Sequence, residues 1–205
     1  MNYNTLPTKS SLDRTILSLS SKGYKVFSVQ NSKEALKKIQ EIIPDGSTIM
    51  NGSSTTLNQI GFTDLLKQNN HKWNNLHEMI VNEKDPVKQS KLRKEATISD
   101  YYIGSVHAIT EDGDMVIASN TGSQLPNIVF SSNNLVLVIS TQKIVSNLSE
   151  AIDRLENYVK PLEDKRSTEV YGVPTSVNKV LIFKGENPYM GRTVSVILVN
   201  EVLGF

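Results

Sequence analysis

The amino-acid sequence predicts an α/β protein in which a layered, mostly parallel sheet is flanked by helices. Short apolar segments of strand length alternate with segments whose hydrophobic residues recur at helical spacing. The run Leu135–Ile139 is continuously apolar and rich in β-branched residues, as in a strand buried on both faces. With 205 residues, of which 38% are hydrophobic and 21% charged, we expect one domain over residues 1–205.

The first sixty residues predict two helix–strand units and the start of a third. Leu12, Ile16 and Leu19 recur at helical spacing, and Gly23 stands where a helix C-terminal cap is expected. Pro44 predicts the end of the second helix. The expected elements are a helix over 10–22, a strand over 25–29, a helix over 32–43, a strand over 48–50 and a helix through 57–60.

Residues 62–99 are rich in helix-forming sequence. Leu65, Leu66 and Trp73 supply apolar side chains, and Pro86 occupies the favoured first position of a strongly charged helix. We expect this stretch to form either a helical layer over one side of the sheet or a lid.

The second half of the chain continues the alternation. Strands are expected over 101–103, 115–118 and 135–139, with a helix near 125–130. Asn147-Leu148-Ser149-Glu150 is a capping-box pattern that begins a helix, and Pro161 predicts its end. Within 179–200, the runs Lys179–Phe183 and Thr193–Val199 predict a closing pair of strands.

Composition excludes several classes of protein. Without cysteine the chain can hold no iron–sulfur cluster, thiolate metal site or disulfide; any other cofactor is left unknown, and no set of metal ligands is evident. The 22 basic and 21 acidic residues give a charge of +1, which offers no reason to expect a nucleic-acid partner. The longest clean apolar run is too short to span a membrane, and the N-terminal region does not resemble a signal peptide. We therefore expect a cytoplasmic protein with no membrane partner.

Four polar segments directly follow predicted strands. In parallel sheets the carboxyl ends of the strands meet at one edge, and ligands bind there. We therefore expect these segments to form one pocket. The candidate ligand-binding residues are Asn51, Gly52, Ser53, Ser54, Thr55, Thr56, Gly104, Ser105, Thr121, Gly122, Ser123 and Gln142.

The segment Asn51–Thr56 favours a bound anion. A glycine lets the backbone approach a ligand closely, and hydroxyl groups beside the free amides of a helix start suit a phosphate or a carboxylate. The alternative is that the hydroxyl groups only cap the helix.

Lys143 and Glu111 are the candidate catalytic residues. Lys143 follows a hydrophobic strand, where it can neutralise an anion or polarise a carbonyl; the alternative is a solvated or carboxylate-paired lysine. Glu111 is the candidate acid or base, although Glu111-Asp112-Gly113-Asp114 is also a favourable turn sequence.

Several motifs together resemble the LUD-domain family, the lactate-utilisation (LutC/YkgG-like) proteins. No single motif is diagnostic, but their order and spacing are specific, and they extend from about residue 10 to 200. The motifs are Asn51-Gly52-Ser53-Ser54-Thr55-Thr56-Leu57, Gly104-Ser105-Val106-His107-Ala108, Thr121-Gly122-Ser123-Gln124-Leu125-Pro126, Gln142-Lys143-Ile144-Val145, Ala151-Ile152-Asp153-Arg154 and Pro161-Leu162-Glu163-Asp164.

The resemblance implies a fold like that of the NagB/RpiA/CoA-transferase group, in which a strand-to-helix loop holds phosphate. It also implies a link to the oxidation of lactate to pyruvate, in which family members accompany iron–sulfur proteins. By this resemblance we expect a compact, stand-alone member, and three hypotheses follow for its function. It is an enzyme or enzyme-like pocket for a small anionic metabolite, a non-catalytic accessory subunit of iron–sulfur partners, or a ligand-sensing module. Its oligomeric state is left open.

Overall fold

The structure, a computed structural model, describes residues 2–205 and contains two sheets. The larger is parallel throughout, in the order β1 (Lys25–Val29), β10 (Thr193–Val199), β7 (Asn134–Ser140), β4 (Tyr101–Gly104), β2 (Thr48–Asn51) and β3 (Asn74–Asn75). The smaller has the order β8 (Ile144–Val145), β5 (Ala108–Thr110), β6 (Met115–Ser119) and β9 (Lys179–Phe183). Its β5–β8 pair is parallel, and the β5–β6 and β6–β9 pairs are antiparallel.

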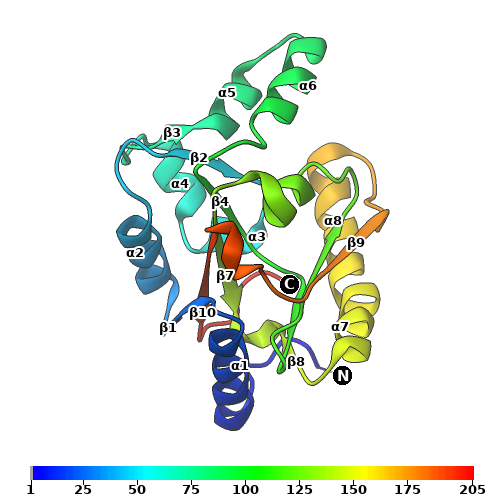
Figure 1. The fold of residues 1–205 in the computed structure, drawn as a ribbon. Coiled ribbons are helices and arrows are strands. Elements are labelled where there is room, and N and C mark those ends of the chain that lie inside the picture. Colours follow the sequence, from blue (N-terminus) through cyan, green and yellow to red (C-terminus); the bar gives the residue numbers. More distant parts are fainter. Residues whose placement is uncertain (1) are drawn as a thin grey trace.

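Helices surround the sheets (Figure 1). They are α1 (Lys9–Ser21), α2 (Ser32–Ile42), α3 (Thr55–Gln59), α4 (Phe62–Lys67), α5 (Leu76–Asn82), α6 (Pro86–Glu95), α7 (Leu148–Arg154) and α8 (Lys160–Tyr171). Asn31 caps α2 and Asn147 caps α7, because each side chain accepts a hydrogen bond from the amide three residues later.

The core is layered, because the strands of the parallel sheet alternate their side chains between two faces. In β7, Leu135 and Leu137 pack with α1 and the smaller sheet, whereas Val136 and Val138 pack with α2, α3 and α4. A third cluster joins the far face of the smaller sheet to α7 and the turn that follows it. The α/β class expected from the sequence is therefore confirmed.

The last two strands differ from expectation. The predicted closing pair does not form: β9 pairs with β6 in the smaller sheet, and β10 lies between β1 and β7 in the larger one. Six consecutive residues of β10 are buried, as a central parallel strand requires, whereas β9 keeps exposed positions as an edge strand. The sequence does not predict β5 and β8, because strands of three and two residues are too short to show an alternation of hydrophobic and polar side chains.

The helix that begins with α7 continues past Pro161, against the expectation that it ends there. A π-helical turn, Leu155–Val159, separates α7 from α8, and Pro161 lies in the first turn of α8. The altered turn interrupts the regular hydrogen-bond pattern, so the missing proline N–H is tolerated. This continuation places the α8 side chains beside the main cavity.

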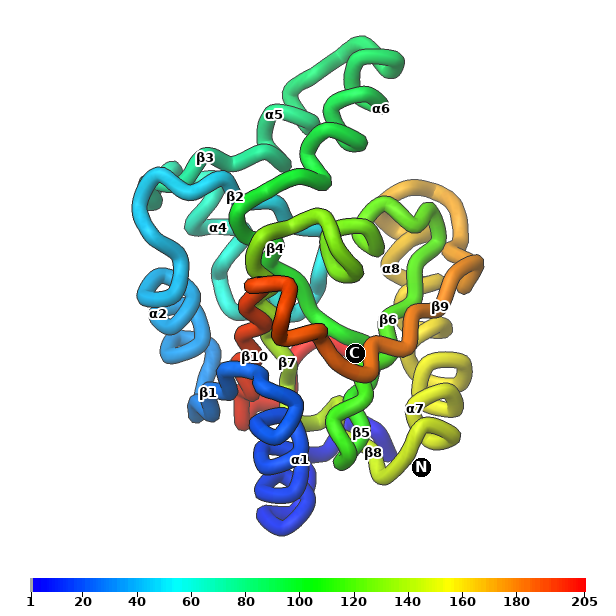
Figure 2. Tube along the Cα trace, in the orientation of Figure 1, coloured from blue at the N-terminus to red at the C-terminus, as the bar shows by residue number. Residues whose placement is uncertain are grey.

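Residues 62–99 divide into two parts. Helix α4 buries Phe62 and Leu66 beside the parallel sheet, whereas α5 and α6 project from the body as an arm (Figures 1 and 2). Helix α6 has no buried residue, and Val87 is 78% exposed. Across residues 2–205, the helices are too short or too polar to cross a membrane.

Candidate ligand-binding pocket

A cavity of about 580 Å³ lies between the edge of the parallel sheet, the smaller sheet and α8. Its wall includes the segments that follow β2, β4 and β6, and it extends to the base of the arm. The C-terminal residues Gly204 and Phe205 complete the wall, and Figure 2 shows that the C-terminus returns to the middle of the molecule. Three of the four predicted polar segments therefore meet here, and of the fourth only Lys143 lines the cavity. The segment after β6 arrives from the smaller sheet, whose β6 pairs are antiparallel, and not from the parallel sheet as expected.

Lys143 is buried in this wall, with only 3% of its surface exposed. Its Nζ donates hydrogen bonds to Thr56 Oγ1 (3.0 Å), Ser105 Oγ (3.2 Å) and the Val106 carbonyl oxygen (3.0 Å). The topology explains this meeting: β7, β4 and β2 are neighbours, and these groups lie just beyond their carboxyl ends.

The surroundings of Lys143 are neutral or positive. All three hydrogen-bond acceptors of Nζ are uncharged, and among residues 2–205 no carboxylate forms an ion pair with Lys143. Burial lowers the pKa of Lys143 to about 7, and the positive charge of Arg154 adds to the effect.

Arg154 is a second buried cation near the cavity. Its Nη1 donates to the His107 carbonyl oxygen, while Nε and Nη2 have no hydrogen-bond partner. The guanidinium lies 5.8 Å from the ring centroid of Tyr3 and 5.1 Å from that of Tyr158, at cation–π distance. Burial lowers the pKa of Arg154 to about 10. This part of the protein therefore holds more positive than negative charge.

His107 lines the cavity and presents a neutral ring. Its Nδ1 accepts a hydrogen bond from the Ala118 amide at 3.0 Å, so the single ring proton is on Nε2. Burial, together with the positive charges of Lys143 and Arg154, lowers the pKa of His107 to about 3. The ring is consequently a hydrogen-bond donor at neutral pH.

The loop after β2 supplies hydroxyl groups to the cavity. Ser54 caps α3, because its Oγ accepts a hydrogen bond from the Leu57 amide at 3.3 Å. Ser53, Thr55 and Thr56 also line the cavity. Helix α3 has only five residues, so its dipole is small, and the hydroxyl and amide groups are the relevant donors.

Gly52 allows a close approach of two chain segments. A side chain at this position would place its Cβ 3.0 Å from the Tyr102 hydroxyl and 3.3 Å from Gln124 Oε1. This contact explains the glycine in the loop.

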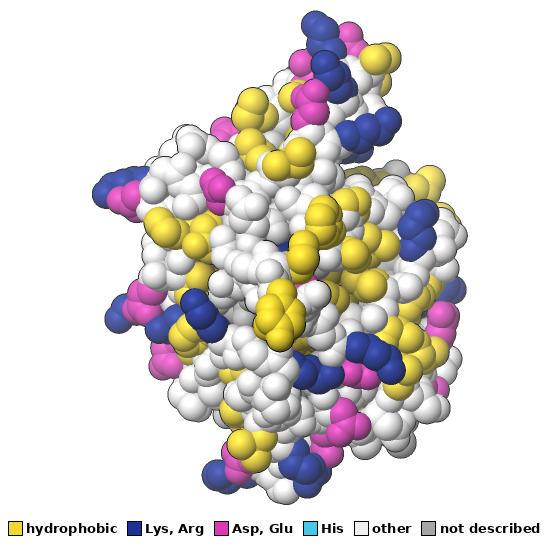
Figure 3. All heavy atoms as spheres, viewed as in Figure 1, with side chains coloured by type: hydrophobic (Ala, Val, Ile, Leu, Met, Phe, Trp, Pro, Cys, Tyr) yellow, Lys and Arg dark blue, Asp and Glu magenta, His cyan; other side chains and the backbone are white. Residues whose placement is uncertain are grey.

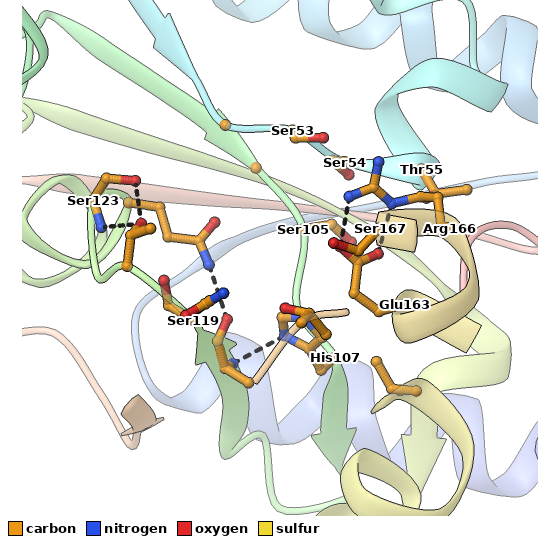
Figure 4. Close-up of a pocket in the computed structure, with 18 of the residues that line it drawn as sticks. Ser53, Ser54, Thr55, Ser105, His107, Ser119, Ser123, Glu163, Arg166 and Ser167 are labelled. Atoms are coloured by element: carbon orange, nitrogen blue, oxygen red, sulfur yellow. Dashed lines mark hydrogen bonds and ion pairs between the residues drawn. The ribbon is translucent and has the colours of Figure 1, made fainter. Parts of the chain in front are cut away.

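The opposite wall comes from α8 (Figure 4). Glu163 accepts two hydrogen bonds from Arg166, of 2.7 and 2.5 Å, and the pair points toward the Ser54–Thr55 side of the cavity. Ser167 and Lys160 also line this wall. Sequence reasoning misses these residues because Pro161 is read as a helix end; the Glu163–Arg166 spacing is the signal that indicates one helical face.

Three candidate residues do not line the cavity. The Glu111 carboxylate accepts two hydrogen bonds of 2.8 Å from Arg14, outside the cavity wall, and these bonds lower its pKa. Gln142 Nε2 donates to the carbonyl oxygens of Leu203 (2.9 Å) and Gly204 (3.1 Å) and so holds the C-terminal segment. Gly122 has a φ of +86° and packs against Lys179. The other candidates, Asn51–Thr56, Gly104, Ser105, Thr121, Ser123 and Lys143, all line it.

Comparisons with solved structures place the fold. A DUF162 family protein from Deinococcus radiodurans superposes with a TM-score of 0.57 at 10% identity, covering 96% of this chain and 100% of that one. Ribose 5 phosphate isomerase A from Neisseria gonorrhoeae gives a TM-score of 0.37 at 16% identity, over 76% of each chain. The first likeness shows a shared fold, and the second is too weak to support an inference.

A search of curated proteins found no match. The family model described as "LUD domain" matches residues 12–179, which is most of the chain and includes nearly all of the cavity wall described above. The chain therefore belongs to the LUD-domain family.

Proposed function

We propose that this LUD-domain protein binds a small phosphorylated or carboxylated metabolite in the cavity, as part of lactate or other organic-acid utilisation. The observation that carries the proposal is the buried Lys143, which ends among uncharged oxygen atoms and has no carboxylate partner among residues 2–205. Burying a cation without a counter-ion is unfavourable, and a ligand anion would supply the missing charge.

Donors for such an anion surround Lys143. Thr56 and Ser105 offer hydroxyl groups beside Nζ. Thr55 and Thr56 are the first two residues of α3, so their amides have no partner within the helix. Arg166 lines the opposite wall, where Glu163 already offsets its charge. These groups favour an anion in the part of the cavity that Lys143 and the first residues of α3 line.

Thermal denaturation tests the proposal with sulfate, inorganic phosphate, L-lactate and pyruvate as separate probes. A ligand present at a hundred times its Kd stabilises the folded state by about 2.7 kcal/mol, which raises Tm by several degrees. Lys143→Met should weaken binding at least about tenfold, because it removes a charge-assisted hydrogen bond. Lys72→Met is the matched control, since Lys72 is exposed and pairs with Asp45 away from the cavity. No stabilisation by any probe would reject the proposal.

Binding should also depend on pH. An anion beside Lys143 raises its pKa from about 7, so binding takes up a proton and tightens as pH falls through 7. Sulfate and L-lactate are the suitable probes, because neither titrates in this range. An affinity that is constant from pH 6 to 9 would place the anion elsewhere.

An accessory role beside iron–sulfur proteins of lactate oxidation is the second candidate. It is favoured by the absence of cysteine and by the projecting arm, on which Met79, Val81 and Val87 are more than half exposed. Figure 3 shows further hydrophobic side chains gathered over the segment between β9 and β10. Recovery of cysteine-rich partners from the native host, with no turnover by the purified chain, would favour this role. Turnover of an organic acid by the purified chain would exclude it.

A further inference from the structure

We propose that Lys143 forms an imine with the carbonyl carbon of a ligand that also carries a carboxylate or a phosphate. The inference rests on the proposed pocket function and narrows its ligand class to 2-oxo acids and to aldehydes or ketones that bear a phosphate.

The hydrogen-bond partners of Lys143 suit a neutral amine. An –NH₂ group donates two hydrogen bonds and accepts one, whereas –NH₃⁺ donates three. Of the three partners of Nζ, only the Val106 carbonyl oxygen is restricted to accepting. The hydroxyl groups of Thr56 and Ser105 can accept or donate, so one of them can donate to the nitrogen lone pair. The same three groups therefore satisfy the neutral amine, whereas the protonated form still lacks a counter-ion.

The charges around Lys143 also favour its neutral amine form. The Arg154 guanidinium is buried and unpaired, and the neutral His107 ring lines the same cavity. Among residues 2–205 no carboxylate is paired with either cation, so no negative charge opposes the loss of the Lys143 proton. With a pKa of about 7, roughly half of Lys143 is the free amine at pH 7. This fraction is roughly a thousand times that of an ordinary lysine, whose pKa is near 10.4.

The step balances without any oxidant or reductant. The lone pair of Lys143 Nζ attacks the carbonyl carbon, the C–N bond forms, the C=O π bond breaks, and one proton passes from the nitrogen to the oxygen to give a neutral carbinolamine. The nitrogen lone pair then forms the C=N bond as the C–O bond breaks, the hydroxyl group leaves as water with a second proton taken from solvent, and a protonated imine remains. The carboxylate or phosphate of the ligand offsets the positive charge of this imine.

The cavity gives the ligand room for both groups. It extends from Lys143 along the Ser53–Thr56 loop toward Arg166, over a volume of about 580 Å³. The hydroxyl and amide donors of the loop hold the anion while the carbonyl faces Nζ. A neutral ketone lacks the anionic group that these donors bind. A hydroxy acid lacks the ketone or aldehyde carbonyl that Lys143 attacks.

Reductive trapping tests the inference with four probes. The full chain is incubated at pH 7 with sodium cyanoborohydride and pyruvate, dihydroxyacetone phosphate, acetone or L-lactate. Intact-mass spectrometry then measures the adduct, and peptide mapping locates it. We expect one adduct per chain with pyruvate or dihydroxyacetone phosphate, at Lys143. Acetone should label at least tenfold more slowly, and L-lactate should give no adduct.

Two variants keep the test independent of folding. Lys143→Arg retains a cation but cannot form an imine under these conditions, and Lys72→Arg makes the same change at an exposed lysine. Labelling should be lost in Lys143→Arg and unchanged in Lys72→Arg, with thermal denaturation confirming that both variants fold. In the wild type, the labelling rate of Lys143 should rise as pH increases through 7 and then level off. The labelling rate of surface lysines should continue to rise at higher pH.

The outcomes separate the two proposals. Stabilisation by the anions without an adduct at Lys143 would overturn the imine and leave the proposed function intact. Adducts that persist in Lys143→Arg, spread over surface lysines, would also overturn it. The absence of both stabilisation and adducts would reject the imine and the proposed pocket function together.

Discussion

Lys143 is the residue on which the site depends, and its burial has a thermodynamic consequence. The unfolded chain exposes this lysine to water, where its pKa is near 10.4. In the folded state burial lowers the pKa to about 7. Between these two values the unfolded state therefore binds a proton that the folded state does not.

This difference predicts how stability changes with pH. Between pH 7 and about 10.4 the free energy of unfolding contributed by Lys143 should rise with pH, because the unfolded state binds more protons there. Below pH 7 both states are protonated and the contribution is constant. One pKa unit corresponds to about 1.4 kcal/mol, so the full effect is on the order of several kcal/mol.

Urea denaturation of the wild type and Lys143→Met at pH 7 to 10 measures this effect. The wild type should gain stability relative to Lys143→Met as pH rises, and Lys72→Met should keep the wild-type slope. Parallel slopes in the wild type and Lys143→Met would show that Lys143 stays protonated when the chain folds.

At the scale of elements, the Arg14–Glu111 pair joins α1 to the turn between β5 and β6. The Glu111 side chain is 20% exposed and the Arg14 side chain 55%, so solvent screens the pair. Glu111→Gln should therefore reduce the free energy of unfolding by less than about 1 kcal/mol and leave ligand stabilisation unchanged. Thermal denaturation with and without the best probe measures both quantities, and a loss of ligand stabilisation would place Glu111 in the site after all.

The C-terminal segment is an element of the cavity wall, and Gly204 permits its path. Gly204 has a φ of +65°, and a Cβ at this position would overlap the Thr56 hydroxyl and lie 3.2 Å from Lys143 Nζ. Gly204→Ala should therefore destabilise the protein by about 1–3 kcal/mol and weaken ligand binding. Gly185→Ala is the control, because that glycine has no atom within 4 Å of the added group. Denaturation of both variants measures the difference in their stability. If Gly204→Ala is as stable as Gly185→Ala, Gly204 is not needed for the path of the C-terminal segment.

The π-helical turn Leu155–Val159 is an element that the sequence does not reveal. A proline pattern alone favours a helix end at Pro161, whereas in the structure Leu155 and Val159 pack against the smaller sheet and the helix continues. As a result the Glu163–Arg166 pair reaches the cavity, although its residues lie beyond the predicted end.

At the scale of the whole molecule, stability is unevenly distributed. Helix α6 has no buried residue, whereas β7 and β10 lie in the centre of the parallel sheet and are buried on both faces. Amides of α6 should therefore exchange with solvent by local opening, well before those of β7 and β10. Hydrogen exchange followed by mass spectrometry measures this order, with α2 as the control helix because Ala35 and Ile39 are fully buried. Protection of α6 equal to that of β7 would show that the arm is held by contacts beyond this chain.

The sequence by itself determined the α/β class, most strands of the parallel sheet and the polar segments at their carboxyl ends. These features depend on local periodicity, and Leu135–Ile139 or the Ser54 cap can be recognised without knowing any partner. It also indicated Lys143, which follows the hydrophobic strand within one short turn.

Only the tertiary structure decided which side chains meet. Glu111 and Arg14 are 97 positions apart, and Lys143 and Thr56 are 87 apart, so no local pattern records either pairing. The short strands β5 and β8, the burial of Arg154 and the place of α8 likewise depend on long-range packing. The charge state of a lysine is set by its desolvation and its neighbours, and these exist only once β7, β4 and β2 have come together.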